Sequence, residues 1–315
     1  MIMAAVASSH RALAMNVARS LFLMTAMLAA IWSIWHTWPD IAAAAARLTV
    51  LDMLLAAIAA GGFAITSCLA WRTLIADHAS PISFTQTARV FFLGQIGKFI
   101  PGGIWQFVAS AELGRDAGIT RAAILASFAY ALIASLIAGA AVVLLSVPQV
   151  LAQLSIPPVW IIVTAIIATL GLVGVALTQP FKRLREGSNT PPVGRFFAAI
   201  ALSILTWLFG GLHIWLLARG IGIPAELSDI WLLAGCYAAA WIAGFLVIIA
   251  PAGVGAREVT LIALLAISMP VPEATIIALL SRVITTLVDL VAAALALAFT
   301  HPPTSPPAAP PRLLD

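Results

Sequence analysis

Charged side chains are scarce in this sequence, and long hydrophobic runs take their place. Only 9% of the 315 residues are Asp, Glu, Lys or Arg, whereas 63% are hydrophobic. Soluble domains carry roughly 25% charged residues, because a large surface must be hydrated. The composition therefore excludes a water-exposed globule and predicts a protein solvated by lipid. The net charge of +4 does not indicate a nucleic-acid partner, because the basic residues lie in short segments between apolar runs, where they usually report membrane orientation.

Cysteine and histidine are too few and too scattered to define a covalent or metal framework. Cys68 and Cys236 each lie inside an apolar run, so neither reads as half of a secreted disulfide framework. The five histidines show neither an HExxH motif nor a metal-ligand spacing. The sequence has no Gly-x-Ser-x-Gly elbow, and GQIGK lacks both the spacing of a phosphate loop and its Ser or Thr after Lys. We therefore expect no metal, no cofactor and no catalytic residue.

The apolar runs match the length of membrane spans. A bilayer core of about 30 Å needs roughly 20 apolar residues in a helix, which satisfies its own backbone polar groups. The sequence thus predicts an all-α, polytopic integral membrane bundle of seven or eight spans. Two stretches, 73–121 and 251–272, are too polar or too short for a simple span and are candidates for broken or re-entrant helices. The seven predicted spans are 20–38, 53–71, 122–147, 159–178, 196–218, 230–250 and 274–299.

The termini and loops set the expected orientation. The basic leader resembles a signal sequence, but its apolar run at 20–38 exceeds the usual core of about 7–15 residues, so an uncleaved first span is favoured over cleavage at the alanines of 42–46. Lys and Arg before the first span, after the second and after the fourth place the N-terminus in the cytoplasm. The C-terminus would lie outside with seven spans and inside with eight. We assign 1–300 to the membrane domain and 301–315 to a Pro-rich disordered tail, and we expect no soluble catalytic domain.

Two similar irregular motifs carry the strongest functional signal. They are PGGIWQ at 101–106 and PAGVGARE at 251–258, and each has a glycine about seven residues upstream, Gly94 or Gly244. Each precedes a short helical segment and a long span, which indicates an internal repeat. Pro and Gly break helices, and transporters use paired breaks to hold anionic substrates. Lys98 and Arg257 beside the breaks would favour a phosphate or carboxylate. The alternative is that each Pro-Gly pair only turns a surface loop.

The last predicted span contains two ionisable residues. Arg282 and Asp289 are seven apart and share one helix face. An ionisable residue at mid-bilayer costs roughly 2.5–3.5 kcal/mol, so it usually faces a partner or a cavity. Arg282 is expected either to pair with Glu258 or to contact a lipid phosphate in bidentate fashion. A purely structural salt bridge between helices remains the alternative.

These motifs resemble the lysylphosphatidylglycerol synthase transmembrane family. The resemblance rests on GQIGKFIPGGIWQ, ELGRDAGITRAAILAS, PAGVGAREVTLIALL and EATIIALLSRVITTLVDL, and it covers about residues 15–300. The family includes the flippase-like half of bacterial multiple-peptide-resistance proteins and stand-alone homologues that handle phospholipids or isoprenoid-type lipids in the bacterial inner (cytoplasmic) membrane. The resemblance implies substrate-binding roles for Lys98, Pro101, Gly102, Gly103, Gln106, Pro251, Gly253, Gly255, Arg257, Glu258 and Arg282.

The sequence also departs from the family pattern. AILASFAYALIAS, in the span after the first motif, is uncharged where family members usually bear an acidic-basic pair. The aminoacyl-transferase half is missing, so synthesis of lysylphosphatidylglycerol is not expected. We expect translocation or binding of an amphipathic phospho- or isoprenoid lipid with an anionic headgroup. The alternatives are a membrane-embedded lipid-linked transferase using Glu258, a small-solute exporter, and an accessory subunit that partners a lipid-modifying enzyme.

Overall fold

The computed structural model describes residues 38–75, 82–100, 104–154, 191–246 and 253–299, and every regular element in these ranges is a helix. This confirms the predicted all-α class. In chain order the helices are α2 (Trp38–Ala45), α3 (Val50–Ile75), α4 (Phe84–Gln95), the 3-10 helix η1 (Ile96–Phe99), α5 (Trp105–Asp116), α6 (Arg121–Leu154), α9 (Val193–Gly220), α10 (Asp229–Leu246), α11 (Ala256–Leu265) and α12 (Val271–Ala298).

Five of the described helices are long and apolar enough to cross a membrane. They are α3, the Arg121–Ser146 part of α6, α9, α10 and α12, and they correspond to five of the seven predicted spans. The chain is therefore a multi-pass helical membrane protein. The predicted span at 159–178, the tail at 301–315 and all but the last residue of the span at 20–38 lie outside the described residues. The total of seven or eight spans and the cytoplasmic N-terminus stay predictions.

Several spans turn large apolar side chains outward. On α3, Val50 is 68% exposed and Ile58 is 69% exposed, and Leu287 and Val291 are more than half exposed on α12. Soluble monomers rarely expose contiguous apolar patches of this kind. Lipid tails solvate such side chains without cost, so these faces suit a bilayer environment.

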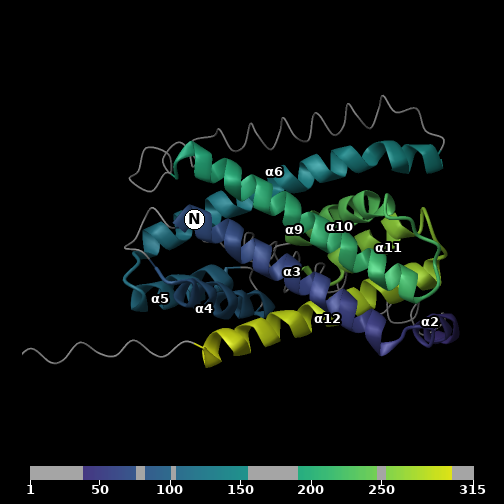
Figure 1. Cartoon of the computed structure of the whole chain (residues 1–315), viewed down its shortest axis with the longest axis horizontal. Coiled ribbons are helices and arrows are strands. Elements are labelled where there is room, and N and C mark those ends of the chain that lie inside the picture. Colours follow the sequence, from purple (N-terminus) through teal and green to yellow (C-terminus); the bar gives the residue numbers. More distant parts are fainter. Residues whose placement is uncertain (1–37, 76–81, 101–103, 155–190, 247–252, 300–315) are drawn as a thin grey trace, which may run out of the picture.

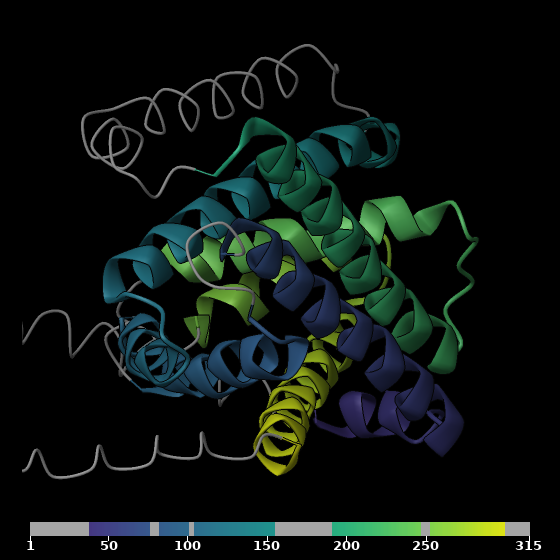
Figure 2. The same ribbon diagram turned by 60° about the vertical axis from the view of Figure 1, so that its left-hand side comes forward.

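The spans cross one another in a bundle in which α9 lies against both α3 and α10 (Figures 1 and 2). Small residues allow the close approach of α9 and α10. A Cβ atom at Gly211 of α9 would lie 2.5 Å from the Ile230 carbonyl oxygen, and one at Gly210 would lie 2.5 Å from the Tyr237 ring. Membrane helices pack through such small residues because lipid provides no hydrophobic drive for their association.

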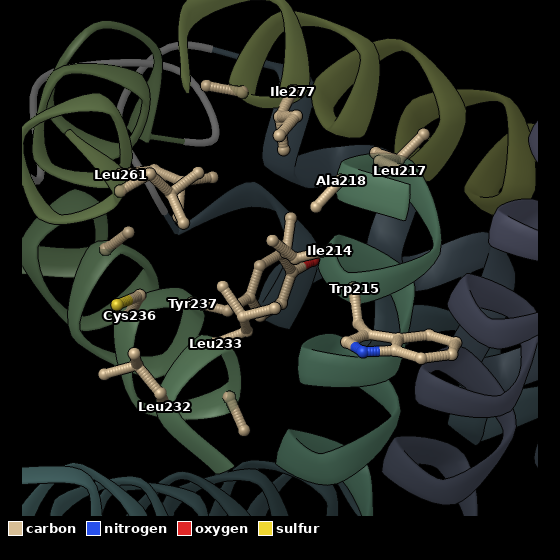
Figure 3. Packing of buried hydrophobic residues seen from close by; sticks show 14 of the residues in the cluster. Ile214, Trp215, Leu217, Ala218, Leu232, Leu233, Cys236, Tyr237, Leu261 and Ile277 are labelled. Atoms are coloured by element: carbon tan, nitrogen blue, oxygen red, sulfur yellow. The ribbon is translucent and has the colours of Figure 1, made fainter. Parts of the chain in front are cut away.

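The main core lies where α9, α10, α11 and α12 meet (Figure 3). Tyr237 from α10 is 1% exposed and belongs to the same buried cluster as Ile214 of α9, Leu261 of α11 and Ile277 of α12. The Phe63 ring of α3 packs edge-on against Tyr237 at a centroid distance of 5.6 Å. Aromatic pairs of this kind add about 0.5–1.5 kcal/mol beyond their buried area.

A second core joins α3, α4, α5 and α6. Trp71 stacks on Phe128 with ring centroids 4.8 Å apart, and its indole N–H donates to the Ser127 hydroxyl at 3.0 Å. Phe91 of α4 and Ala111 of α5 are buried in the same cluster. The short helices α4 and α5 are therefore anchored to the spans by aromatic packing.

Both irregular stretches take part in helical hairpins: the first contains α4, η1 and α5, whereas the second contributes α11, which packs against the preceding span α10. We call α4, η1 and α5 the first hairpin, and α10 and α11 the second hairpin. In the first, the returning chain passes so close that a Cβ at Gly97 would lie 2.6 Å from the Gln106 backbone nitrogen, and one at Gly94 would collide with the Ser110 side chain. In the second, a Cβ at Gly244 would lie 2.9 Å from Cβ of Arg257. Both hairpins therefore show a close approach at a glycine seven residues before the proline of the motif, while the internal repeat stays a prediction.

The buried His213 on α9 has a packing role. Its Nδ1 lies 2.8 Å from the Ala56 carbonyl oxygen and therefore donates, while Nε2 accepts from the Ser281 hydroxyl at 3.0 Å. The histidine links α3, α9 and α12 with both ring nitrogens satisfied. Among the described residues, no group of three His, Cys, Asp or Glu side chains is placed to hold a metal ion.

Candidate functional site

A cavity of about 420 Å³ lies between the two hairpins and the spans α3, α6, α9 and α12. Its volume falls within the roughly 300–1,000 Å³ of typical small-molecule pockets. Residues in or beside both motifs line it: Gln106 in the first motif and Lys98 just before it, and Gly253 and Arg257 in the second motif. The α12 span contributes Arg282, Thr285, Thr286 and Asp289. Two segments far apart in the sequence therefore meet around one cavity.

Arg257 lies near the start of α11 and points to Tyr237 on α10. Its Nη2 donates to the Tyr237 hydroxyl at 2.5 Å, and its guanidinium carbon lies 4.8 Å from the centroid of that ring. No carboxylate of the described residues lies within ion-pair distance of this guanidinium. The positive charge is therefore oriented by a neutral partner and remains formally uncompensated at the cavity wall.

Lys98 and Asp289 form the second contact of the site. The Lys98 ammonium, at the end of η1, lies 2.6 Å from the Asp289 carboxylate on α12, and the two side chains are 26% and 19% exposed. The ammonium also lies 5.5 Å from the centroid of the Phe99 ring. This ion pair attaches the first hairpin to α12.

Arg282 and Glu258 attach the second hairpin to the same helix. Nε of Arg282 lies 3.5 Å from Oε1 of Glu258, which is an ion-pair distance rather than a hydrogen bond. The other carboxylate oxygen of Glu258 accepts the Gly255 backbone N–H at 2.6 Å. Glu258 therefore caps the N-terminus of α11, where a carboxylate is favoured by the helix dipole. Gly255 adopts φ +88°, a conformation that glycine accepts without strain.

The rest of the cavity wall is predominantly apolar and rich in aromatic rings. Phe92, Phe107 and Trp241 are among the aromatic residues that line it. The α6 span supplies only uncharged side chains, among them Phe128, Leu132 and Ser135. The charged groups of the cavity therefore come from the hairpins and α12, in line with the uncharged AILASFAYALIAS segment noted in the sequence.

The predicted site residues fall into three groups. Those that line the cavity are Lys98, Gln106, Gly253, Arg257 and Arg282. Glu258 and Gly255 stand behind that wall, where they shape the start of α11. Pro101, Gly102, Gly103 and Pro251 lie outside the described residues. The structure thus brings the described members of both motifs together, while their binding of a substrate remains a prediction.

Two contributors were missing from the predicted site. Asp289 was recognised as an ionisable residue of the last span, but its pairing with Lys98 joins positions that no local pattern connects. Tyr237 lies in an apolar run without any motif, and only the return of α11 against α10 places it beside Arg257. The chain has only two tyrosines among its 315 residues, and this rarity was the only sequence signal that could have pointed to Tyr237.

The fold and the cavity together define a polytopic helical membrane protein in which two broken-helix hairpins meet a charged span. The chain belongs to the family described as the lysylphosphatidylglycerol synthase TM region, whose model matches residues 16–293. This confirms the resemblance inferred from the motifs. A search among curated proteins found no match.

Proposed function

We propose that this protein binds an amphipathic lipid through an anionic headgroup in the cavity and moves that headgroup across the membrane. The observation that carries the proposal is Arg257, a cavity-lining guanidinium whose described partner is the neutral Tyr237. An uncompensated cation in a membrane protein is expensive unless it meets an anion or water. A phosphate oxygen pair matches the planar donor fork of arginine.

The composition of the cavity supports an amphipathic ligand over a fully polar one. Thr285, Thr286 and Gln106 continue the polar surface next to the charged groups, while Phe92 and Phe107 provide apolar surface in the same cavity. A translocated lipid needs such a polar path for its headgroup, because its tails stay in hydrocarbon. Membership in a family of lipid-related membrane regions supports the same interpretation.

The transferase alternative requires a carboxylate or histidine that is available to a substrate. Glu258 is engaged as the cap of α11 and as the partner of Arg282, and Asp289 is paired with Lys98. His213 is not a cavity-lining residue and has both ring nitrogens occupied. These contacts favour binding and transport over catalysis.

The proposed orientation places the N-terminal ends of α6 and α9 and the C-terminal end of α3 in the cytoplasm. These ends lie together on the left of Figure 1 and carry Arg72, Arg121 and Arg195. The opposite end carries Arg47 and Arg219 beside the acidic residues Glu226 and Asp229, so its excess of basic residues is smaller. The asymmetry supports a cytoplasmic side at the arginine-rich end, in an inner membrane.

The proposal is tested by reconstituting the protein in vesicles with fluorescent lipids and following their exchange between leaflets. We expect exchange faster than in empty vesicles for lipids with an anionic headgroup, and a reduction of about tenfold or more in Arg257→Gln, since a lost charged contact costs roughly 1.5–3 kcal/mol. Arg115→Gln is the matched control, because Arg115 is exposed at the end of α5. Exchange equal to that of empty vesicles for every lipid class would refute translocation.

Three further outcomes separate the alternatives. Fast uptake of a water-soluble headgroup without acyl chains, such as glycerophosphoglycerol, would favour the small-solute exporter. Lipid exchange at the wild-type rate in Arg257→Gln would show that the headgroup does not bind in this cavity. Copurification of a lipid-modifying enzyme, together with absence of exchange by the purified chain, would favour the accessory subunit.

A further inference from the structure

Five ionisable side chains of the described residues lie in the cavity wall or directly behind it. Lys98, Arg257 and Arg282 are basic, while Asp289 lines the cavity and Glu258 stands behind Arg282. Three positive charges against two negative charges leave a formal charge of one positive unit. The neighbouring polar residues, such as Gln95, Gln106 and Thr286, add no charge.

The pairing of these groups shows where the excess charge lies. The Lys98 ammonium lies 2.6 Å from the Asp289 carboxylate. The net charge of this pair is zero, whichever of the two groups carries the proton. Arg282 has Glu258 at 3.5 Å. Arg257 contacts only the neutral Tyr237 among its described partners, so the net charge of the site is centred on its guanidinium.

We propose that Asp289 and Glu258 set the charge of the accepted headgroup, and that the cavity selects a headgroup with one net negative charge, of the phosphodiester class. This inference rests on the proposed lipid-binding function. In a medium of low polarity, any charge left over after binding is costly. A monoanion brings the site to neutrality, a phosphate monoester dianion leaves one negative charge, and a zwitterion leaves the positive charge of Arg257 uncompensated.

Asp289 is then a specificity-determining residue that acts through Lys98. It occupies the ammonium that would otherwise offer a second cationic contact to a ligand. Removal of its charge frees Lys98 for the ligand and raises the formal charge of the site by one unit. The expected consequence is a change in selectivity rather than a loss of binding.

The inference is tested by competition against a fluorescent phosphatidylglycerol on detergent-solubilised full-length protein at pH 8. The competitors have matched acyl chains and are phosphatidylglycerol as the monoanion, phosphatidic acid as the near-dianion and phosphatidylcholine as the zwitterion. The second pKa of a phosphate monoester is about 6, so the group carries nearly two negative charges at this pH. Glycerophosphoglycerol without acyl chains distinguishes recognition of a lipid from recognition of its free headgroup.

The wild type is expected to bind phosphatidylglycerol ahead of both other lipids. In Asp289→Asn the affinity of phosphatidic acid relative to phosphatidylglycerol should rise by at least about tenfold, which is the effect of one unit charge acting across about 12 Å in an effective dielectric of about 20. Asp116→Asn removes the same charge from the exposed end of α5 and should leave the ratio unchanged. The double variant Lys98→Gln with Asp289→Asn keeps the net charge of the site and should keep the wild-type preference.

A ratio that is equal in the wild type and Asp289→Asn, while phosphatidylglycerol still binds, would overturn the inference and leave the proposed function standing. A double variant that behaves like Asp289→Asn would also overturn it. If Asp289→Asn does not fold, Lys98→Gln tests the opposite direction, because a neutral site should bind phosphatidylcholine better relative to phosphatidylglycerol. Absence of binding of all three lipids to the wild type would instead refute the proposed function, and the inference with it.

Discussion

The Lys98 ammonium and the Asp289 carboxylate lie 2.6 Å apart, and their contact joins the first hairpin to α12. Reversal of one charge, in Lys98→Asp, would place two carboxylates together. We expect it to lower stability by roughly 2 kcal/mol, less than the 3–5 kcal/mol for removal of one partner of a fully buried pair, because both side chains retain some exposure. The double variant Lys98→Asp with Asp289→Lys should recover most of the loss. The midpoint of thermal unfolding in detergent measures both, and a double variant no more stable than the single one would contradict a direct contact.

Insertion of a methyl group at Gly97 should loosen the first hairpin. A Cβ there would lie 2.6 Å from the Gln106 backbone nitrogen, and a backbone atom cannot move aside as a side chain can. We expect Gly97→Ala to cost about 1–3 kcal/mol, the usual range for overpacking. The control is Gly61→Ala on α3, where a Cβ meets no atom within 4 Å. That control should change stability by less than about 1 kcal/mol, since alanine is the better helix former. Equal thermal midpoints for the two variants would show that the hairpin tolerates a wider separation.

Replacement of Arg257 by lysine should separate its charge from its geometry. Arg257→Lys retains the positive charge but loses the planar donor fork that a phosphate engages and that now contacts the Tyr237 hydroxyl. We expect lipid exchange intermediate between the wild type and Arg257→Gln, with a loss of several-fold. Exchange at the wild-type rate would mean that the headgroup senses only the charge. The rate of leaflet exchange in vesicles is the measurement.

Removal of the His213 ring should affect stability and spare selectivity. His213→Phe removes the imidazole N–H that donates to the Ala56 carbonyl and leaves the Ser281 hydroxyl without its described acceptor. Buried groups that lose their partners cost about 1–3 kcal/mol, so the thermal midpoint should fall. The relative affinities for phosphatidylglycerol and phosphatidic acid should not change, because His213 does not line the cavity. A changed affinity ratio with an unaltered midpoint would place His213 in the binding site.

The orientation can be checked by thiol labelling, in sealed vesicles, of variants that each carry one added exposed cysteine. Cys68 and Cys236 are buried, so the background reactivity should be low. Asp116→Cys at the exposed end of α5 should react only with reagent on the cytoplasmic side, and Leu227→Cys, whose side chain is 72% exposed, only from the opposite side. Labelling of both positions from the same side would contradict the proposed orientation.

The sequence predicted the spans and the broken motifs because both leave local marks. Uninterrupted apolar runs predicted five helices close to their observed bounds, and Pro and Gly marked the two stretches in which a simple span is interrupted. The pairing of Arg282 with Glu258 was also named in advance, because few ionisable partners exist in so apolar a chain.

The remaining features depend on contacts that a linear pattern does not encode. Spans that face lipid on one side and protein on the other are apolar all round, so their periodicity does not reveal which face is buried. The partner of Lys98 was therefore not identifiable before α12 was placed against the first hairpin. The contact of Tyr237 with Arg257 likewise follows only from the return of α11 along α10.

The seven-residue spacing of Arg282 and Asp289 on α12 fixes the distance between the points at which the two hairpins are attached. At about 1.5 Å of rise per residue, the two attachment points are separated by about 10 Å along one rigid rod, on nearly the same face. Each hairpin is tied to its own point by an ion pair. Any movement that widens the distance between the hairpins must therefore break one of these pairs or bend the rod. Movement of both hairpins together with α12 breaks neither ion pair. It therefore changes the shape of the cavity at a lower free-energy cost.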